Sequence, residues 1–357
     1  MVAVRVAYTL EQCWHRVPGG TGVAALRTAE AMDGIPGVEL VGVAGKHAHP
    51  PAEEWVPTIP WKQLPIASPW LYEAWLHVNW PRPESVTGAV DVVHATTLIP
   101  CPTKKPLVVT LHDLAFKHNP ENFTKHGIRV FDRSLTLIKR WADLVLCCSQ
   151  ATLDDCLAAG IDADRLRHVP LGVEFEHATP EDIDRVRARH RLPERYLLFV
   201  GTVEPRKNLR RLARAVAQLE EPLPLIVAGA DGWGDAALGM VGNVRFLGFV
   251  STTDLWALYA GAEVFCYPSV HEGFGLPVLE AMAQGTPVVT SGDTATQEAA
   301  DGAAVLVDPN DIDDIARGIT EARNRRAELS TKGRHRVAQA TWHNTAELTL
   351  AAYAELV

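Results

Sequence analysis

Short apolar runs rich in β-branched residues recur along the chain, and stretches with helical spacing of apolar residues separate most of them. A strand that is buried on both faces has such a continuous apolar run, and alternation with helices is typical of parallel βα units. The pattern therefore predicts the α/β fold class. In chain order the predicted strands lie in "VRVAYTL", "VELVGVAG", "VVHAT", "PLVVTLHD", "DLVLCCS", "YLLFVGTV", "LPLIVAGA", "VRFLGFV", "AEVFCYPS", "TPVVTS" and "AVLVD".

The predicted strands form two series, which a polar and charged segment separates. The last strand of the first series ends at Pro170–Val173, and "EFEHATPEDIDRV" follows it. The chain has 357 residues, and at about 150 residues per domain each series has room for its own doubly wound, Rossmann-like sheet. We predict one domain over 1–173 and a second over 174–340. Residues 341–357 have apolar side chains at helical spacing, so they form a helix that either caps the second domain or crosses back to the first.

Residues 47–83 interrupt the alternation of strands and helices. This segment holds eight prolines and five tryptophans. We predict a long irregular excursion, and long loops of compact domains often carry binding or catalytic residues.

Composition and charge exclude several classes of partner. A net charge of -9 disfavours nucleic acid, because phosphate binding needs a basic field. No apolar run approaches the roughly 18 residues of a membrane span, so membrane association is peripheral at most. The six cysteines lack a CxxC pair and most lie in apolar runs, which predicts buried, reduced thiols and a cytoplasmic setting. The oligomeric state stays open.

Two turns between a strand and a helix are candidate anion sites. In "VPGGTG", Gly19 and Gly20 open a helix, where backbone N–H groups and the helix dipole favour an anion, although such a turn can equally be structural. The spacing misses GxGxxG, which disfavours a dinucleotide oxidoreductase. In "GTVEPRKNL", Arg206 and Lys207 precede a helix, where cations oppose the dipole unless an anion lies between them. The alternative is that both are solvated surface charges.

The stretch "HEGFGLPVLEAMAQGTPVVTS" holds two carboxylates, Glu272 and Glu280, with seven residues between them. Gly273 and Gly275 predict a turn and Pro277 suits the start of a helix, so Glu272 lies in the loop and Glu280 in the helix. Even on one continuous helix the two side chains would stand roughly 80° apart. They are therefore not the facing acid and base of a sugar hydrolase.

Together these motifs resemble the retaining glycosyltransferases of family 4 (GT4), which have the GT-B fold. The resemblance rests on the E-x7-E pattern, "GTVEPRKNL", "GFVSTTDLWALYAGAEVFCYPS", "GGTG" and "TLHDLAF", and it covers nearly the whole chain in the expected order. It implies two Rossmann-like domains facing a central cleft, with a nucleotide diphosphate sugar bound mostly by the second domain. It also implies front-face substitution, in which the departing phosphate oxygen takes the proton of the acceptor hydroxyl. No protein base, no DxD metal site and no essential divalent metal are then expected.

The resemblance also assigns roles to individual residues. Glu272 would hydrogen-bond hydroxyls of the transferred sugar, and Glu280 those of the nucleotide's ribose. Arg206 and Lys207 would neutralise the diphosphate. The backbone N–H groups expected to assist belong to Gly19, Gly20, Phe274, Gly275 and Leu276.

Two further positions match the family's motifs. Val250 matches the loop whose backbone reads the base, and His112 matches the histidine that reaches the donor sugar or its phosphate from the first domain. The alternative for His112 is a histidine satisfied at a strand end, and Asp113 is expected to fix the turn. The chain departs from the family at Thr202, where many members carry Arg, so Arg206 is expected to take over that charge.

Donor and acceptor are predicted from weaker features. The forms of "GTVEPRKNL", "TLHDLAF" and "GADGWGD" (229–235) resemble bacterial mannosyltransferases, which favours GDP-mannose over UDP-glucose. Tryptophans stack well on sugar rings, although they can instead pack the loop onto its own domain. The candidates for acceptor binding are Trp14, Trp55, Trp61 and Trp70.

The acceptor itself stays open between two kinds of molecule. We expect a soluble mannose oligosaccharide, such as an intermediate of an actinobacterial methylated polymannose. A lipid-linked acceptor is the alternative, because 125–141 mixes basic and apolar residues as interfacial helices do; an ordinary surface helix explains that pattern as well. Two rival functions are a sugar-nucleotide epimerase of the same fold and a sensor that binds the donor without turning it over.

Overall fold

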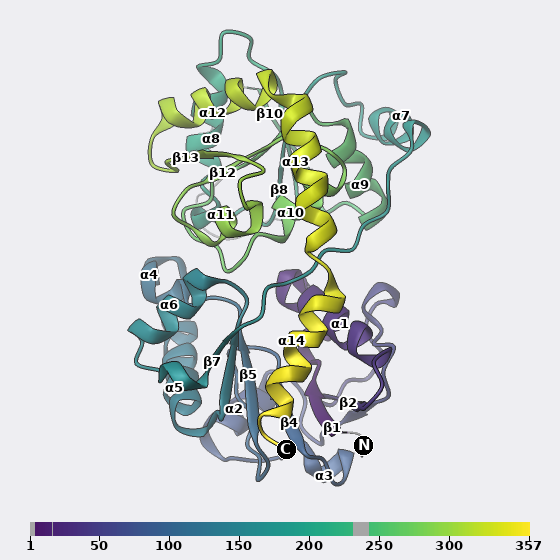
Figure 1. The fold of residues 1–357 in the computed structure, drawn as a ribbon, viewed down its shortest axis with the longest axis vertical. Coiled ribbons are helices and arrows are strands. Elements are labelled where there is room, and N and C mark those ends of the chain that lie inside the picture. Colours follow the sequence, from purple (N-terminus) through teal and green to yellow (C-terminus); the bar gives the residue numbers. More distant parts are fainter. Residues whose placement is uncertain (1–3, 16, 231–242) are drawn as a thin grey trace. The chain divides into compact units, whose positions relative to one another are not determined.

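A computed structural model describes residues 4–15, 17–230 and 243–357. The chain divides into two compact units, one of Met1–Gly172 with Trp342–Val357 and the other of Val173–Thr341 (Figure 1). Each unit holds one parallel sheet with helices, so the predicted α/β class with two doubly wound sheets is confirmed. Most of the "GADGWGD" motif lies outside the described residues.

The sheet of the first unit has seven parallel strands in the order β3-β2-β1-β4-β5-β6-β7. The order reverses between β1 and β4, and ligands of open α/β sheets bind outside the carboxyl ends of the strands at such a switch point. Its strands are β1 (Val4–Thr9), β2 (Val38–Ala44), β3 (Trp61–Gln63), β4 (Val92–Ala95), β5 (Leu107–Leu111), β6 (Leu144–Cys147) and β7 (Leu166–His168).

Apolar residues fill both faces of this sheet, because neighbouring residues of a strand point to opposite sides. On β1, Val6 and Tyr8 belong to one core and Ala7 to the other. The first core includes residues of α1 and α14, and the second includes residues of α2, α5 and α6. The helices of the unit are α1 (Gly19–Asp33), α2 (Trp70–His77), α3 (Glu84–Thr87), α4 (Ala115–His118), α5 (Lys125–Trp141), α6 (Gln150–Ala158) and α14 (Trp342–Ala354).

The last helix, α14, belongs to the first unit, although the residues before it belong to the second. It packs against α1 (Figure 1). The hydroxyl of Tyr353 lies 2.6 Å from His94 Nδ1 on β4, and the other ring nitrogen of His94 lies 2.7 Å from the Thr110 hydroxyl. Both Tyr353 and His94 are buried, so this hydrogen-bonded chain fixes α14 against the middle of the sheet.

The segment 47–83 is more regular than the sequence predicts. It supplies β3, the edge strand of the first sheet, and α2, whose Trp75 and Leu76 are buried in the core below the sheet. The expectation of one long irregular excursion is therefore wrong for β3 and α2, whereas most of the remaining segment is irregular. A strand of three residues is too short to show a periodicity. The prolines that flank both elements are typical of loops, so the sequence pattern indicated neither element.

The sheet of the second unit has six parallel strands in the order β10-β9-β8-β11-β12-β13. This order reverses between β8 and β11, so the second unit has a switch point of the same kind. Its strands are β8 (Leu197–Val200), β9 (Leu225–Ala228), β10 (Val244–Gly248), β11 (Val264–Tyr267), β12 (Val288–Ser291) and β13 (Val305–Val307).

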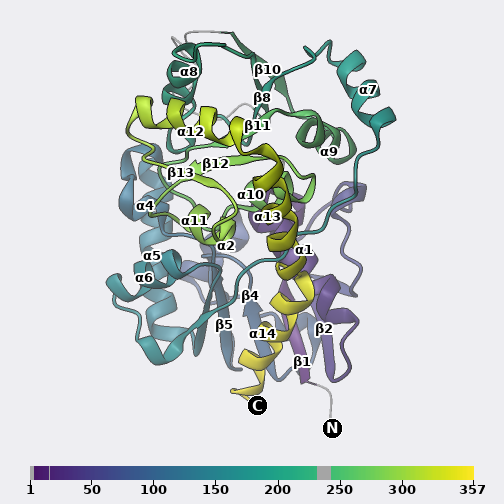
Figure 2. The same ribbon diagram turned by 45° about the horizontal axis from the view of Figure 1, so that its top comes forward.

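Helices lie on this second sheet as well, and α10 packs along α13 (Figure 1, Figure 2). The alternation of helices and parallel strands is what the apolar runs of the sequence predict. The helices of the unit are α7 (Pro180–Arg189), α8 (Leu209–Ala217), α9 (Thr252–Gly261), α10 (Leu276–Ala283), α11 (Ala295–Ala300), α12 (Ile312–Asn324) and α13 (Arg326–Gln339).

Two remaining sequence expectations concern cysteines and membranes. All six cysteines are buried thiols, as predicted. Within the described ranges, every helix falls short of the length and apolar character needed to cross a membrane.

Candidate functional site

The switch point of the second sheet brings together charged residues from two loops. One loop follows β8 and contains the 3-10 helix η5 (Pro205–Lys207), which carries Arg206 and Lys207. The other follows β11 and carries Glu272, directly before α10. The predicted site residues of "GTVEPRKNL" and "HEGFGLPVLE" therefore meet at the edge where an open α/β sheet binds its ligands.

A buried asparagine contributes to holding these loops together. Asn208 has a left-handed backbone, with φ of 62°, where the chain passes from η5 into α8. Its side-chain amide donates to the carbonyls of Pro268 at 2.9 Å and Pro309 at 2.6 Å. Asn208 is buried, so these bonds are shielded from water; the bond to Pro268 fixes the loop after β8 against the loop after β11, and the bond to Pro309 fixes it against the segment after β13.

Arg206 and Lys207 both pair with Glu272. Lys207 Nζ lies 2.7 Å from Glu272 Oε1, and Arg206 Nη1 lies 2.8 Å from Glu272 Oε2. Arg206 also pairs with the buried Glu204 at 2.7 Å. Lys207 is only 7% exposed and Glu272 8%, so Lys207 is not a solvated surface charge; Arg206 is half-buried and held by two carboxylates.

The two neighbouring cations determine the protonation state of Glu272. Burial by itself would raise the pKa of Glu272, but Arg206 and Lys207 hold it at about 2, so the carboxylate is ionised. Burial lowers the pKa of Lys207, and the pairing with Glu272 opposes that shift. Lys207 also donates to the hydroxyl of Tyr267 and lies 4.8 Å from the centre of that ring. Sequence reasoning treated Glu272 and the two cations as separate contacts, whereas the structure joins them in one network.

The turn before α10 is a candidate site for an anion. Gly275 caps the helix with φ of 120°, and a Cβ atom there would lie 3.1 Å from Thr296 Cγ2. Phe274 and Leu276 on either side are buried. The first N–H groups of a helix have no partner within it, so those of this turn are suited to an anion. The predicted phosphate contacts of Phe274, Gly275 and Leu276 stay predictions.

Glu280 is held differently from Glu272. Glu272 lies in the loop and Glu280 in α10, as the sequence predicts. The hydroxyl of Tyr259, on α9, donates to Glu280 Oε2 at 2.8 Å. Burial raises the pKa of Glu280, and the bond from Tyr259 opposes that rise. Sequence reasoning missed Tyr259, because no local spacing connects it to a residue on another helix.

Val250, the predicted base contact, lies between β10 and the start of α9. The hydroxyl of Ser251, next to it, accepts a hydrogen bond from Asp254 N at 3.3 Å and caps α9. The cap fixes the backbone of this loop, and the contact between Val250 and a base stays a prediction.

In the first unit, His112 follows the end of β5 near the switch point of that sheet. Its Nε2 lies 3.2 Å from the carbonyl of Thr96, and since a carbonyl only accepts, Nε2 carries the proton. Burial lowers the pKa of His112, so the ring is neutral and Nδ1 can accept a hydrogen bond. Asp113 accepts from Ala115 N at 2.9 Å, which fixes the turn as predicted. The hydrogen bond to Thr96 satisfies His112 at a strand end, so both interpretations of this histidine remain.

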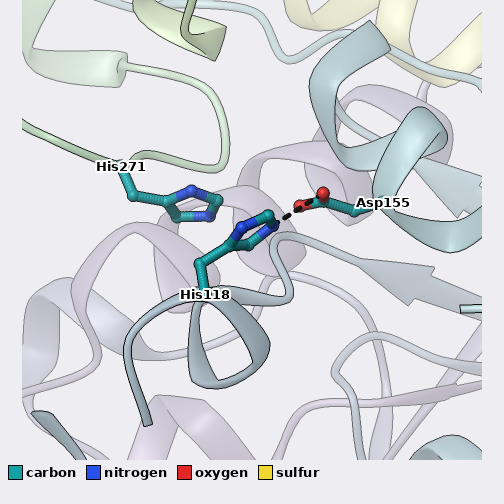
Figure 3. Close-up of side chains that lie close together, drawn as sticks. All are labelled: His118, Asp155 and His271. Carbon is teal, nitrogen blue, oxygen red and sulfur yellow. Dashed lines mark hydrogen bonds and ion pairs between the residues drawn. The ribbon is translucent and has the colours of Figure 1, made fainter. Parts of the chain in front are cut away.

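The helix that follows this turn, α4, is tied to α6. Figure 3 shows His118 of α4 pointing toward Asp155 of α6, and the two are hydrogen-bonded at 2.7 Å.

Gly19 and Gly20 are exposed at the start of α1. Gly19 has φ of 61°, and nothing lies within 4 Å of the position that a Cβ atom would take there. The predicted contact of Gly19 and Gly20 with a phosphate stays a prediction.

The four predicted acceptor tryptophans do not form one cluster. Trp14 stacks on His47 at 4.8 Å and meets Trp61 edge-on at 5.0 Å. Trp55 lies instead against Gly22 of α1, and Trp70 is 70% exposed at the start of α2. The structure thus brings together Trp14 and Trp61, and it adds His47, which no sequence pattern indicated.

The buried carboxylate of Glu11 orients this aromatic group. It follows β1, accepts from Gly45 N at 2.6 Å and lies 3.1 Å from His47 Nε2. A Cβ atom at Gly45 would lie 3.1 Å from Glu11 Oε2, so glycine leaves the room that the carboxylate occupies. The hydrogen bond to Glu11 therefore fixes the ring of His47 and, with it, the stack of His47 on Trp14.

Two family models match the chain, and together they cover most of it. Residues 18–177 match "Glycosyltransferase Family 4", and residues 181–341 match "Glycosyl transferases group 1". Over 264 residues the chain is 34% identical to the O-antigen chain mannosyltransferase B of Escherichia coli, an alignment that spans 69% of each protein. The chain belongs to glycosyltransferase family 4.

A further relative and two solved structures are similar to the chain. The chain is 33% identical over 251 residues to the MMP alpha-(1->4)-mannosyltransferase of Mycolicibacterium hassiacum, covering 62% of this chain and 59% of that protein. HepE of Anabaena, in complex with UDP and glucose, has a TM-score of 0.73 at 20% identity and covers 99% of this chain and 100% of its own. Sucrose-phosphate synthase of Thermosynechococcus elongatus has a TM-score of 0.76 at 22% identity and covers 99% of both. These likenesses bear out the GT-B fold, and the chain is a glycosyltransferase.

Proposed function

We propose that this glycosyltransferase moves mannose from a nucleotide diphosphate donor to a hydroxyl of a saccharide, with retention of the α-configuration. GDP-mannose is the donor that we favour. The observation that carries the proposal is the buried cluster of Arg206, Lys207 and Glu272 at the switch point of the second sheet. Two cations and an ionised carboxylate at that edge match a diphosphate joined to a polyhydroxylated sugar.

The cluster supports the following mechanism. In the structure, Glu272 pairs with both Arg206 and Lys207, and Glu204 pairs with Arg206 as well. A bound diphosphate would take over the two cations, and the carboxylate would then accept hydrogen bonds from hydroxyls of the sugar. As the bond to the sugar breaks, negative charge grows on the leaving diphosphate, which is where fixed cations stabilise a transition state most strongly.

Proton transfer in this mechanism does not pass through Glu272. Its pKa of about 2 keeps it ionised, so it has no proton to give to a leaving group at neutral pH. We propose that the departing phosphate oxygen takes the proton of the acceptor hydroxyl on the same face of the sugar. Because Arg206 and Lys207 supply the charge at the diphosphate, a divalent metal is not expected to be essential.

The relatives support mannose as the transferred sugar and a mannose-containing saccharide as the acceptor. They include an O-antigen chain mannosyltransferase and an MMP alpha-(1->4)-mannosyltransferase. For the acceptor we propose a mannose oligosaccharide that stacks on the aromatic group of Trp14, His47 and Trp61. A lipid-linked acceptor and a UDP-glucose-type donor are the alternatives that experiments must separate.

The first experiment identifies the donor. Purified protein is heated with GDP, UDP or ADP, and the ligand that binds the native state raises the melting temperature. GDP-mannose and UDP-glucose are then offered with an α-linked mannobiose, with and without EDTA, and the anomeric configuration of the product is read by NMR. We expect GDP to stabilise most and mannose to be transferred with an α-linkage in EDTA. An inverted product or complete loss of transfer in EDTA contradicts the mechanism.

The second experiment tests Glu272. The variant Glu272→Ala should lose transfer while it still binds the nucleotide, because the sugar contact is removed and the cations remain. Normal turnover by this variant would sink the assignment. The same assay separates transfer from epimerisation, since a transferase releases nucleotide faster when acceptor is added, whereas an epimerase does not respond to acceptor.

A further inference from the structure

The two carboxylates of the E-x7-E pattern differ in their partners. Glu272 pairs with two cations, whereas Glu280 takes a hydrogen bond from the Tyr259 hydroxyl at 2.8 Å and, within the part of the chain that the structure describes, no ion pair. A carboxylate has about four positions at which it accepts hydrogen bonds. Tyr259 occupies one of them on Oε2.

Packing fixes the ring of Tyr259. It is fully buried on α9, meets Phe265 of β11 edge-on at 5.2 Å, and lies 6.3 Å from Trp256 one turn earlier. The backbone carbonyl of Tyr259 accepts from the Thr286 hydroxyl at 2.6 Å, which fixes the end of α9 as well. Because these contacts fix the position of the ring, they also fix the position of the hydroxyl oxygen relative to Glu280.

The hydroxyl of Tyr259 is a permanent donor. Burial raises its pKa well above the usual value, and the nearby Glu280 raises it further. The proton therefore stays on the tyrosine and points at the carboxylate. A carboxylate that is held by a neutral donor and has no cation beside it suits other neutral donors, and two adjacent hydroxyl groups match its two oxygens.

We propose that Tyr259 is a positioning residue for the donor's ribose: its hydroxyl orients the Glu280 carboxylate so that both oxygens accept from the 2′- and 3′-hydroxyls. The inference rests on the proposed function, in which Glu280 binds the ribose. Tyr259 does not touch the ligand. It sets the plane of the carboxylate that does.

The test compares ribonucleotides with deoxyribonucleotides. Affinities for GDP and 2′-deoxy-GDP are measured by titration calorimetry on wild type, Tyr259→Phe and Glu280→Gln, and UDP and 2′-deoxy-UDP are run in parallel because the ribose is common to both. Wild type should prefer the ribonucleotide about 10-fold or more, since a hydrogen bond to a charged group is lost. Tyr259→Phe keeps the ring and should reduce this ratio to a few-fold. It should also raise KM for the donor more than it lowers kcat.

Tyr196 supplies the matched control. It is an equally buried tyrosine of the same unit, and its hydroxyl donates to the Leu258 carbonyl at 2.8 Å. Tyr196→Phe also loses one buried hydrogen bond, so its urea midpoint should fall about as far, but its preference for the ribonucleotide should stay that of wild type.

Each other outcome overturns the inference in a distinguishable way. If Glu280→Gln loses the preference and Tyr259→Phe keeps it, Tyr259 only packs, and the proposed function stands. If both tyrosine variants lose the preference equally, the effect is a general loosening of the unit. If Glu280→Gln keeps the preference, the ribose role of Glu280 is wrong. If neither nucleotide binds the wild type, the proposed function fails and the inference with it.

Discussion

At the scale of single residues, Lys207 and Glu272 stabilise the protein only as partners. Each is almost completely removed from water, and taking a charge out of water is unfavourable unless an opposite charge lies beside it. Removing either one leaves the other buried with less compensation. The cluster that is proposed to bind the diphosphate is therefore also a point at which the folded state is sensitive.

Lys207→Met should lower both stability and activity. The free energy of unfolding should fall by about 3 to 5 kcal/mol, as for other broken buried pairs, and transfer should slow roughly 100- to 1000-fold because a fixed charge at the leaving group is lost. Urea unfolding and steady-state assays measure the two effects. The control is Lys332→Met, which removes an exposed pair with Glu328 on α13 and should leave both nearly unchanged. Equal effects from the two variants would contradict this account.

Glu272 should also make the free energy of unfolding depend on pH in the acidic range. Its pKa in the folded protein is about 2, below the usual 4.5. A lowered carboxyl pKa stabilises the folded state fully above the unfolded value and loses that contribution as pH falls through the folded value. The difference in unfolding free energy between wild type and Glu272→Gln should thus be largest at neutral pH and shrink between pH 4.5 and 2. A difference that stays constant from pH 7 to pH 3 in urea titrations would refute this.

At the scale of elements, the ends of β8 and β9 approach each other through glycines. Gly201 and Gly229 follow these strands with φ of 146° and 147°. A Cβ atom on Gly229 would lie 2.1 Å from the Gly201 carbonyl oxygen, so no larger residue fits without moving the loop that leads to Arg206 and Lys207. These glycines hold the two strand ends close enough for the site to form.

Gly229→Ala should destabilise the second unit more than a glycine substitution without a clash. Both the backbone strain and the contact with Gly201 act there, about 2 to 5 kcal/mol in total. Gly302→Ala is the control, because Gly302 also has a positive φ, 76°, but nothing within 4 Å of the added methyl; strain alone costs about 1 to 2 kcal/mol. Urea midpoints compare the two, and a control that is as destabilised as Gly229→Ala would show that the clash relaxes.

The sequence predicted most strands because each is a short apolar run between helical stretches. It missed β3, and it expected the last strand of the first unit to end at Pro170–Val173, whereas β7 ends at His168. Both strands have three residues, which is too few to show a periodicity. The loop position of Glu272 followed from Gly273, Gly275 and Pro277, which act locally. The bonds from Tyr259 to Glu280 and from Arg206 to Glu272 join residues far apart in the chain. Only the topology of the sheet brings such residues together, so local patterns could not reveal them.

At the scale of the whole molecule, two parallel sheets, of seven and six strands, are built from one chain whose last helix returns to the first unit, and each sheet reverses its order after its first three strands. Each unit has its own core tyrosines. Tyr353 on α14 is buried in the core of the first unit, and Tyr196 beside β8 is buried in the second. Substitutions at these positions should therefore loosen different parts of the chain.

Tyr353→Ala should increase amide exchange within 4–172 and leave 173–341 close to wild type, because the cavity opens in the first core. Tyr196→Ala should give the reverse pattern. Each loss of a buried aromatic ring lowers local stability by about 3 kcal/mol or more. Hydrogen–deuterium exchange with mass spectrometry reads both units in one sample. Uniformly faster exchange in either variant would mean that the two units unfold as one.

The return of α14 to the first unit also sets an order on biosynthesis. Domains of a nascent chain generally fold in the order in which the ribosome makes them. In this chain, the first unit lacks part of its core until Trp342–Val357 has been made, and by then every residue of the second unit is available. The unit that is begun first is thus finished last, and a released chain truncated before α14 would contain every residue of the second unit but an incomplete first unit.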